Sequence, residues 1–233
     1  MNLDWNFMWT AFPDILSYLP VTFQLTVGAL LIAFPVAFLF AWILLKEIPV
    51  LKRIVRVYLS LLRGTPVILQ IFIIYNIVPA LVQQYFNSIG KNINVYETDS
   101  AWYAYLALSL SATAFLTEAF RAAVGTIDKG QLEAAYMVGM NFVSAYRSIV
   151  LPQAFGVAAP IVGNIIVDVI KATSLAFAMS VTEVTGRAKI LGGISLKYFE
   201  AYLDIFFVYI VLIGVVEFLL KRLEKHLVRY KNA

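Results

Sequence analysis

The sequence predicts an all-α integral membrane protein with five transmembrane helices. Of its 233 residues, 61% are hydrophobic and 14% are charged, and the mean hydropathy is +0.82, far from the values of soluble domains. Apolar runs of about 20 residues, the length that crosses a hydrocarbon core as a helix, recur between short charged segments. The chain contains no cysteine, so neither disulfides nor thiol chemistry can hold this fold.

Residues 1–18 predict an extracytoplasmic segment at the membrane surface. They contain no lysine or arginine. Their aromatic residues are Trp5, Phe7, Trp9, Phe12 and Tyr18. A cleavable signal peptide needs a basic start and a small-residue cleavage site, and this stretch has neither. Because tryptophan and tyrosine gather at membrane–water interfaces, we expect a retained interfacial segment.

The first span is predicted from about Val21 to Leu45, and a second apolar stretch runs from near Ile54 to about Val82. A polar break interrupts the second stretch at Arg63, Gly64, Thr65 and Pro66. Proline lacks a backbone N–H and, with a glycine nearby, predicts a kink or a helix restart. Two interpretations of Arg63 stay open, a side chain that reaches the interface or a specific role at the kink.

Residues 83–100 are polar and predict an external loop, and the third span follows from Ala101 to about Val124. Glu118 and Arg121 are three residues apart in this span and therefore share a helix face. Because charges within a membrane are costly unless they are paired, we expect one of two roles. They form an ion pair that anchors the span, or they contribute to a polar path through the membrane.

Gln131 to Pro152 is neither apolar enough for a bilayer nor polar enough for a loose loop. Its key positions are Glu133, Ala134, Ala135, Gly139, Leu151 and Pro152. The alanines favour a short helix with Glu133 near its positive end, and Gly139 predicts a left-handed turn after it. We therefore expect a helix, a glycine turn and a second helical piece, which form a rigid knob at the membrane surface.

The fourth span is predicted from Pro152 to about Val181, and it combines closely spaced small residues, which let another helix approach, with a polar stripe. The stripe consists of Asn164, Asp168 and Lys171, followed by Thr173 and Ser174. The first three share one helix face, and an amide, an acid and a base together have the chemistry to bind a zwitterion. The alternative is that Asp168 only neutralises Lys171.

Residues 184–200 predict a second external segment, the fifth span runs from Ala201 to Leu220, and residues 221–233 form a basic tail. Most lysines and arginines fall in segments that this topology assigns to the inside. Because basic residues collect on the cytoplasmic side, we expect the N-terminus outside and the C-terminus in the cytoplasm. The basic residues flank apolar spans and form no single patch, so we expect no nucleic-acid partner.

The spaced pattern of residues 133–152 resembles the EAA loop of ABC importer permeases. LLRGTPVILQIF and TEAFRAAVGTIDKGQLEAA resemble the polar amino acid branch of that family. The resemblance covers the chain from about Leu19 to the fifth span, and it implies a type I ABC importer transmembrane domain over residues 19–220. It implies that the EAA positions contact an ATPase. A gate at residues 63–66 is a hypothesis beside this resemblance. So is a substrate path along Asn164, Asp168, Lys171, Thr173, Ser174, Glu118 and Arg121.

The family commonly has lysine, aspartate, threonine and serine where this chain has Lys171, Ala172, Thr173 and Ser174. The family's acid is therefore absent, and Asp168 lies one helical turn earlier. The opening DWNFMWTAFPDILSYLPVTFQLT is similar to that of permeases for cystine or other sulfur-containing amino acids. Basic amino acids and glutamine remain open as substrates.

The resemblance implies a permease of the bacterial plasma membrane that works by alternating access. It implies a second permease copy or a sister permease, two ATPase subunits that hold ATP and magnesium, and an extracytoplasmic substrate-binding protein. We expect no catalytic residue, metal site or cofactor on this chain, which has no phosphate-binding loop of the G-x-x-x-x-G-K-[ST] type.

Two other classes stay open. A secondary transporter or channel for small zwitterions would be expected to show inverted repeats, which we do not find in the sequence. A membrane scaffold or assembly protein would explain the spans and the knob but not the polar stripe.

Overall fold

The computed structural model describes residues 3–227, and within them it contains helices and no strand. The long helices are α2 (Leu19–Leu45), α4 (Val67–Ser88), α5 (Ser100–Gly125), α8 (Leu151–Thr173) and α10 (Tyr198–Leu227). The shorter ones are α1 (Trp5–Leu16), α3 (Leu51–Gly64), α6 (Lys129–Met137), α7 (Phe142–Ala145) and α9 (Val184–Ser195). Short turns of other helical types are η1 (Val95–Glu97), η2 (Tyr146–Val150) and η3 (Ser174–Met179). Residues 228–233 of the predicted basic tail lie outside the described residues.

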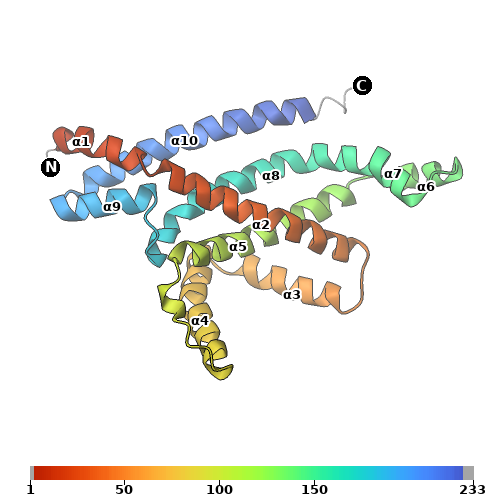
Figure 1. The fold of residues 1–233 in the computed structure, drawn as a ribbon. Coiled ribbons are helices and arrows are strands. Elements are labelled where there is room, and N and C mark those ends of the chain that lie inside the picture. The colour runs from red at the N-terminus through yellow and green to blue at the C-terminus, as the bar shows by residue number, and fades with distance from the viewer. Residues whose placement is uncertain (1–2, 228–233) are drawn as a thin grey trace.

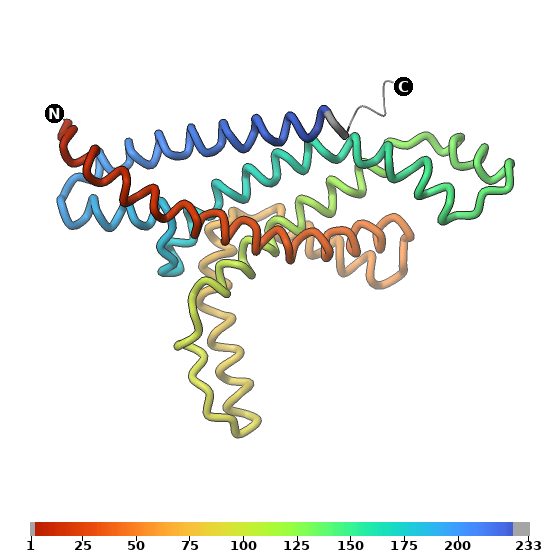
Figure 2. Tube along the Cα trace, turned by 45° about the horizontal axis from the view of Figure 1, so that its top comes forward, coloured from red at the N-terminus to blue at the C-terminus, as the bar shows by residue number. Residues whose placement is uncertain are grey.

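The helices form an elongated bundle around α5. Helices α2, α5, α8 and α10 run roughly along one long axis, and α4 projects from it (Figures 1 and 2). Helix α5 packs against α2 most extensively, and also against α8, α4 and α3. Ala29, Ala33 and Ala37 form a fully buried stripe on α2, spaced so that they share one face. These small side chains let the α2 and α5 backbones approach closely.

Gly28 lies where α2 approaches the Tyr105 ring of α5. A Cβ atom at Gly28 would be 2.4 Å from Tyr105 Cε1, and the Trp102 ring packs against the same ring in a T-shaped arrangement with centroids 5.8 Å apart. We expect Gly28→Leu to force the helices apart and to destabilise the chain by about 1–3 kcal/mol, measured as a lower thermal midpoint. Gly214→Leu is the matched control, because no atom lies within 4 Å of its added Cβ. An equal loss in both variants would contradict this interpretation.

Four helical segments are long and apolar enough to cross a membrane: Trp5–Leu45, Val67–Ser88, Phe142–Met179 and Tyr198–Lys225. The predicted third span coincides with α5, which is not among the four. Serines, threonines and the charged Glu118 and Arg121 make α5 less apolar. Because α2, α4 and α8 surround it, α5 needs no continuous apolar surface toward lipid. By length and composition, four segments of the described chain therefore qualify as spans, and α5 does not qualify on its own.

The predicted second stretch, residues 54–82, is two helices rather than one. Helix α3 ends at Gly64, Thr65 is extended with φ −121° and ψ 143°, and α4 starts at Val67. The residue before a proline is driven from helical to extended backbone, and Pro66 donates no hydrogen bond. The chain therefore changes direction here (Figure 2). The predicted external segment 184–200 is also largely helical, as α9.

The predicted interfacial segment forms helix α1, which packs against α9 and α10. Asp4 caps it by accepting a hydrogen bond from the Phe7 N–H at 2.9 Å. Asp4 also pairs with Lys197, and Asp14 pairs with Arg187. The apolar side of α1 packs in a cluster with α9 and α10. These contacts hold the N-terminal helix on the bundle.

Candidate functional site

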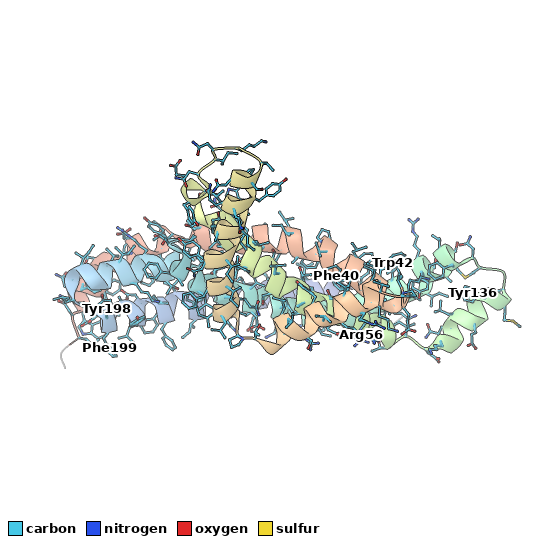
Figure 3. The ribbon with its side chains drawn as sticks, turned by 90° about the horizontal axis from the view of Figure 1, so that it is seen from below. Phe40, Trp42, Arg56, Tyr136, Tyr198 and Phe199 are labelled. Atoms are coloured by element: carbon cyan, nitrogen blue, oxygen red, sulfur yellow. The ribbon has the colours of Figure 1, made fainter. Side chains whose placement is uncertain are left out.

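The knob predicted for residues 131–152 is present at one end of the molecule. Figure 3 shows Tyr136 of α6 at this end, far from Tyr198 and Phe199 at the opposite end. Gly139 follows α6 with a φ of +83°, a left-handed backbone that glycine adopts without strain. Asn141 then caps α7 by accepting from the Ser144 N–H at 2.9 Å. The helix, the glycine turn and the second helical piece are thus all observed.

The predicted place of Glu133 near the start of its helix is wrong. Asp128 caps α6 by accepting from the Gly130 N–H at 2.9 Å, so α6 already begins at Lys129 and Glu133 lies in its second turn. The Glu133 side chain is exposed, as are the apolar residues Met137 (89%) and Val138 (78%) at the tip. We call Glu133, Met137 and Val138 the knob surface. It offers a carboxylate beside apolar side chains.

Two contacts attach the knob to the long helices. Gln153 of α8 donates to the Gln131 Oε1 at 2.6 Å. Lys46, at the C-terminal end of α2, places its Nζ 3.8 Å from the Phe142 ring centroid, and the Phe142 and Tyr146 rings lie 4.2 Å apart. Sequence reasoning counted Lys46 only as an orientation signal. Phe142 and Tyr146, four residues apart in sequence, are the signal that could have indicated this contact, because aromatic faces attract cations.

Arg63 and Arg121 meet at Glu118. Arg121 Nη2 lies 2.7 Å from Glu118 Oε2, and Arg63 Nη1 lies 3.7 Å from Glu118 Oε1. The pair expected within one helix is therefore joined by an arginine from the end of α3. We call Arg63, Glu118 and Arg121 the charged triad. It links the break at residues 63–66 to the central helix.

Gln70 holds the break between α3 and α4, and sequence reasoning missed it. Its Nε2 donates to the carbonyls of Leu62 and Thr65 at 2.7 and 3.0 Å and lies 3.1 Å from Thr65 Oγ1. Thr65 Oγ1 in turn donates to the Leu61 carbonyl at 2.8 Å. These bonds supply partners to carbonyls that have none within a helix because α3 ends here.

The polar stripe of α8 does not converge on one cavity. Lys171 Nζ lies 3.5 Å from Asp168 Oδ1, and the side chains are 54% and 74% exposed. Asp168 lines a cavity of about 280 Å³ between α5 and α8, whereas Asn164 lines another between α8 and α10. Thr173 is buried and donates to the Ile170 carbonyl, and Ser174 donates to the Lys171 carbonyl. Thr173 therefore faces the protein rather than the stripe's exposed side.

Glu183 is a fully buried carboxylate that sequence reasoning missed. Its Oε1 accepts from the Gly186 N–H at 2.9 Å, which caps α9. Its Oε2 accepts from the hydroxyls of Thr22 and Tyr209, both at 3.4 Å. These contacts tie α2 and α10 to α9. Burial raises the pKa of the Glu183 carboxyl, and the hydrogen bonds that it accepts oppose this rise.

The raised pKa of Glu183 predicts that stability falls as the pH increases. The folded chain binds this proton more tightly than the unfolded chain, so its stability contribution is complete below the ordinary pKa of 4.5 and is lost as the pH rises through the folded pKa. We expect the thermal midpoint to fall as the pH rises above the ordinary pKa of 4.5 and Glu183→Gln to reduce this slope. Glu97→Gln is the exposed control and should keep it. An unchanged slope in Glu183→Gln would contradict this assignment.

Within residues 3–227, no group of three or more His, Cys, Asp or Glu side chains is arranged to hold a metal ion. The chain is a multi-pass helical membrane protein, with partly exposed charge pairs on its long helices and an exposed knob at one end. Residues 33–229 match the family described as binding-protein-dependent transport system inner membrane component. The chain belongs to this family.

Curated relatives match over nearly the full chain. The chain is 38% identical to the probable amino-acid permease protein YxeN of Bacillus subtilis, over 91% of this chain and 90% of that protein. It is 35% identical to the L-cystine transport system permease protein TcyL of the same organism, over 96% and 91% of the two chains. The crystal structure of an amino acid ABC transporter with histidines has a TM-score of 0.81 and 27% identity, and the match covers 97% of this chain and 100% of that chain.

Proposed function

We propose that this chain is the permease subunit of an ATP-driven importer that carries a polar amino acid across the bacterial plasma membrane. Family membership is the observation on which the proposal rests. The relatives' names, which include an amino-acid permease and an L-cystine permease, supply the substrate class. The similarity of the N-terminal region and the match to TcyL favour cystine or a related sulfur amino acid. Arginine permeases are also among the relatives, so a basic substrate is the alternative to test.

The knob surface is the proposed contact with a separate ATPase that binds ATP and magnesium. Its exposed carboxylate suits a basic partner surface, and its exposed apolar side chains suit burial in an interface. Ala134, Ala135, Leu151 and Pro152 would shape this contact with Glu133 and Gly139. Because Gln131 and Lys46 attach the knob to α8 and α2, a displacement of the knob would reach two long helices.

We propose five spans, with α5 as the third, an external N-terminus and a cytoplasmic C-terminus. Residues 1–18 would be extracytoplasmic, 19–220 the transmembrane domain and 221–233 the cytoplasmic tail. The distribution of lysine and arginine supports this orientation, which places the knob in the cytoplasm. Large apolar side chains of α4 are exposed, among them Ile73 (56%) and Leu81 (58%). These faces suit lipid or a second permease copy, and the opposite end of the molecule would receive a substrate-binding protein.

The substrate path is proposed to pass the charged triad and the Asp168–Lys171 pair. The charges offer both signs to a zwitterion, and the cavity beside Asp168 borders α5 and α8. Alternating access requires two arrangements of the paired permeases, and ATP binding favours one of them. The break at residues 63–66 is the proposed gate, since it joins the triad to a change in chain direction.

Transport by the reconstituted complex tests this function. The permease, its cognate ATPase and its binding protein are placed in proteoliposomes, and uptake of labelled cystine, arginine and glutamine is measured with and without ATP. We expect uptake that requires ATP and the loaded binding protein. Uptake that an ion gradient drives without the ATPase would replace the proposal with a secondary transporter.

A further inference from the structure

Asp204 is a buried carboxylate that has no role in the proposed transport function. It lies in α10, six residues after Tyr198, which places it about 9 Å along the helix from its first residue. The residue is 2% exposed, and its Oδ2 accepts no hydrogen bond from any residue between 3 and 227. An unpaired carboxylate in apolar surroundings is costly, so the site calls for a cationic partner.

The carboxylate borders a cavity between α1 and α10. The cavity has a volume of about 300 Å³. Its other lining residues are Trp5, Met8, Trp9, Phe12 and Phe207. Trp5 and Trp9 are 61% and 75% exposed, so these rings lie at the outer surface of the cavity. The site is therefore an aromatic pocket at the surface of the bundle, with one acid among its lining residues.

The chemistry of this pocket selects a cation. The faces of tryptophan and phenylalanine attract an ammonium group, and the acid attracts it further and accepts its N–H hydrogen bonds. An anion would be repelled by Asp204. The basic side chains that fasten α1 are already engaged, because Lys197 pairs with Asp4 and Arg187 pairs with Asp14. The pocket thus fits a cation that comes from outside the described chain.

The position of the pocket identifies the source of that cation. Asp204 lies less than two helical turns from the start of α10, beside tryptophans of the kind that mark the membrane–water interface. Phospholipid headgroups occupy this depth. Ethanolamine headgroups carry a primary ammonium with three N–H donors, whereas choline headgroups carry none. A partner that must satisfy an unbonded carboxylate oxygen is therefore of the ethanolamine type.

We propose that the pocket between α1 and α10 binds the ammonium headgroup of an ethanolamine phospholipid through Asp204. Because Asp204 is 2% exposed, binding requires the side chains that line the cavity to move so that the headgroup reaches the carboxylate. The bound headgroup then bridges α1 and α10, next to the ion pairs that join α1 to Arg187 of α9 and to Lys197. This site is independent of the transport proposal, since it uses neither the knob nor the charged triad.

The test compares the full-length chain in nanodiscs that contain phosphatidylethanolamine, phosphatidylcholine or phosphatidylglycerol. We expect phosphatidylethanolamine to raise the thermal midpoint by about 3 °C relative to phosphatidylglycerol, with phosphatidylcholine giving a smaller rise. In Asp204→Asn this lipid difference should vanish, and native mass spectrometry should show fewer retained ethanolamine lipids. Glu217→Gln, which alters an exposed carboxylate on the same helix, should behave as the native chain does.

Three results would overturn the site. The first is a native chain whose midpoint is the same in all three lipids, a measurement that depends on no variant. The second is an Asp204→Asn chain that keeps the full phosphatidylethanolamine effect. If Asp204→Asn is more stable than the native chain by the same amount in every lipid, Asp204 is a strained buried acid without a ligand, and the proposal is also wrong.

Discussion

Gly139→Val is expected to reduce ATP-driven uptake by roughly tenfold while the helical bundle stays folded. Gly139 has a φ of +83°, and a left-handed backbone costs other residues about 1–2 kcal/mol. No atom lies within 4 Å of an added Cβ, so the variant introduces backbone strain without a clash. A strain of about 1.4 kcal/mol corresponds to a tenfold change in an equilibrium. If the strain tilts α6 away from its docking geometry, productive coupling falls by that factor.

The chain offers a matched control for this strain. Gly90 has a φ of +72°, also has no atom within 4 Å of an added Cβ, and lies after α4, away from the knob. Gly90→Val should therefore carry similar strain and keep its coupling. ATP hydrolysis and uptake are measured together in proteoliposomes, with assembly checked by copurification of the ATPase. Equal losses in the two glycine variants would assign the effect to stability, and normal uptake in Gly139→Val would remove the knob from the mechanism.

Glu133→Ala separates the knob's charge from its shape. The side chain is exposed and has no ion pair within residues 3–227, so its loss leaves the helix intact, since alanine favours helix. A coupling defect in this variant would indicate contact with a partner, because nothing inside the described chain depends on that carboxylate. Lys46 connects the knob to α2, because its Nζ contacts the Phe142 ring and the residue lies directly after α2.

The features that the sequence predicted best are determined by residues that are close together in the sequence. The glycine turn at 139 and the short helix before it follow from local backbone preferences, and Pro66 predicted a break in the second apolar stretch. The change of chain direction at that break was not predictable, because Gln70 and the packing of α3 determine how α4 is oriented. The polar composition of α5 is tolerated because other helices surround it, which a single sequence does not reveal.

Contacts between residues far apart in sequence could not be predicted, because a single sequence does not show which helices pack together. Thr22 and Glu183 are 161 positions apart in sequence, and no pattern joins them without the fold. Arg63 reaches Glu118 only after α3 turns back along α5. Sequence reasoning expected the stripe of α8 on one helix face, but it could not show that Asn164 and Asp168 border different cavities. Local motifs therefore predicted the elements, and tertiary packing decided which charges meet.

Asp168→Asn and Lys171→Met are each expected to lower uptake roughly tenfold with little change in thermal midpoint. The two side chains are 74% and 54% exposed and 3.5 Å apart, and an exposed ion pair contributes about 0–1 kcal/mol to stability. A large loss of uptake therefore cannot come from unfolding. It follows if the two charges contact the substrate's ammonium and carboxylate, because losing one charged hydrogen bond costs about 1.5–3 kcal/mol of binding.

The reversed pair distinguishes a substrate contact from a structural one. In the double variant Asp168→Lys with Lys171→Asp, both charges remain and can still pair across one helical turn. If the residues bind the zwitterion, the reversed charges face the wrong ends of the substrate and uptake stays low. If the two residues only form an ion pair with each other, uptake returns toward the native level. Lys52→Gln, which breaks a pair with Glu47 at 2.9 Å, should leave uptake unchanged, because that pair only joins the turn after α2 to the start of α3.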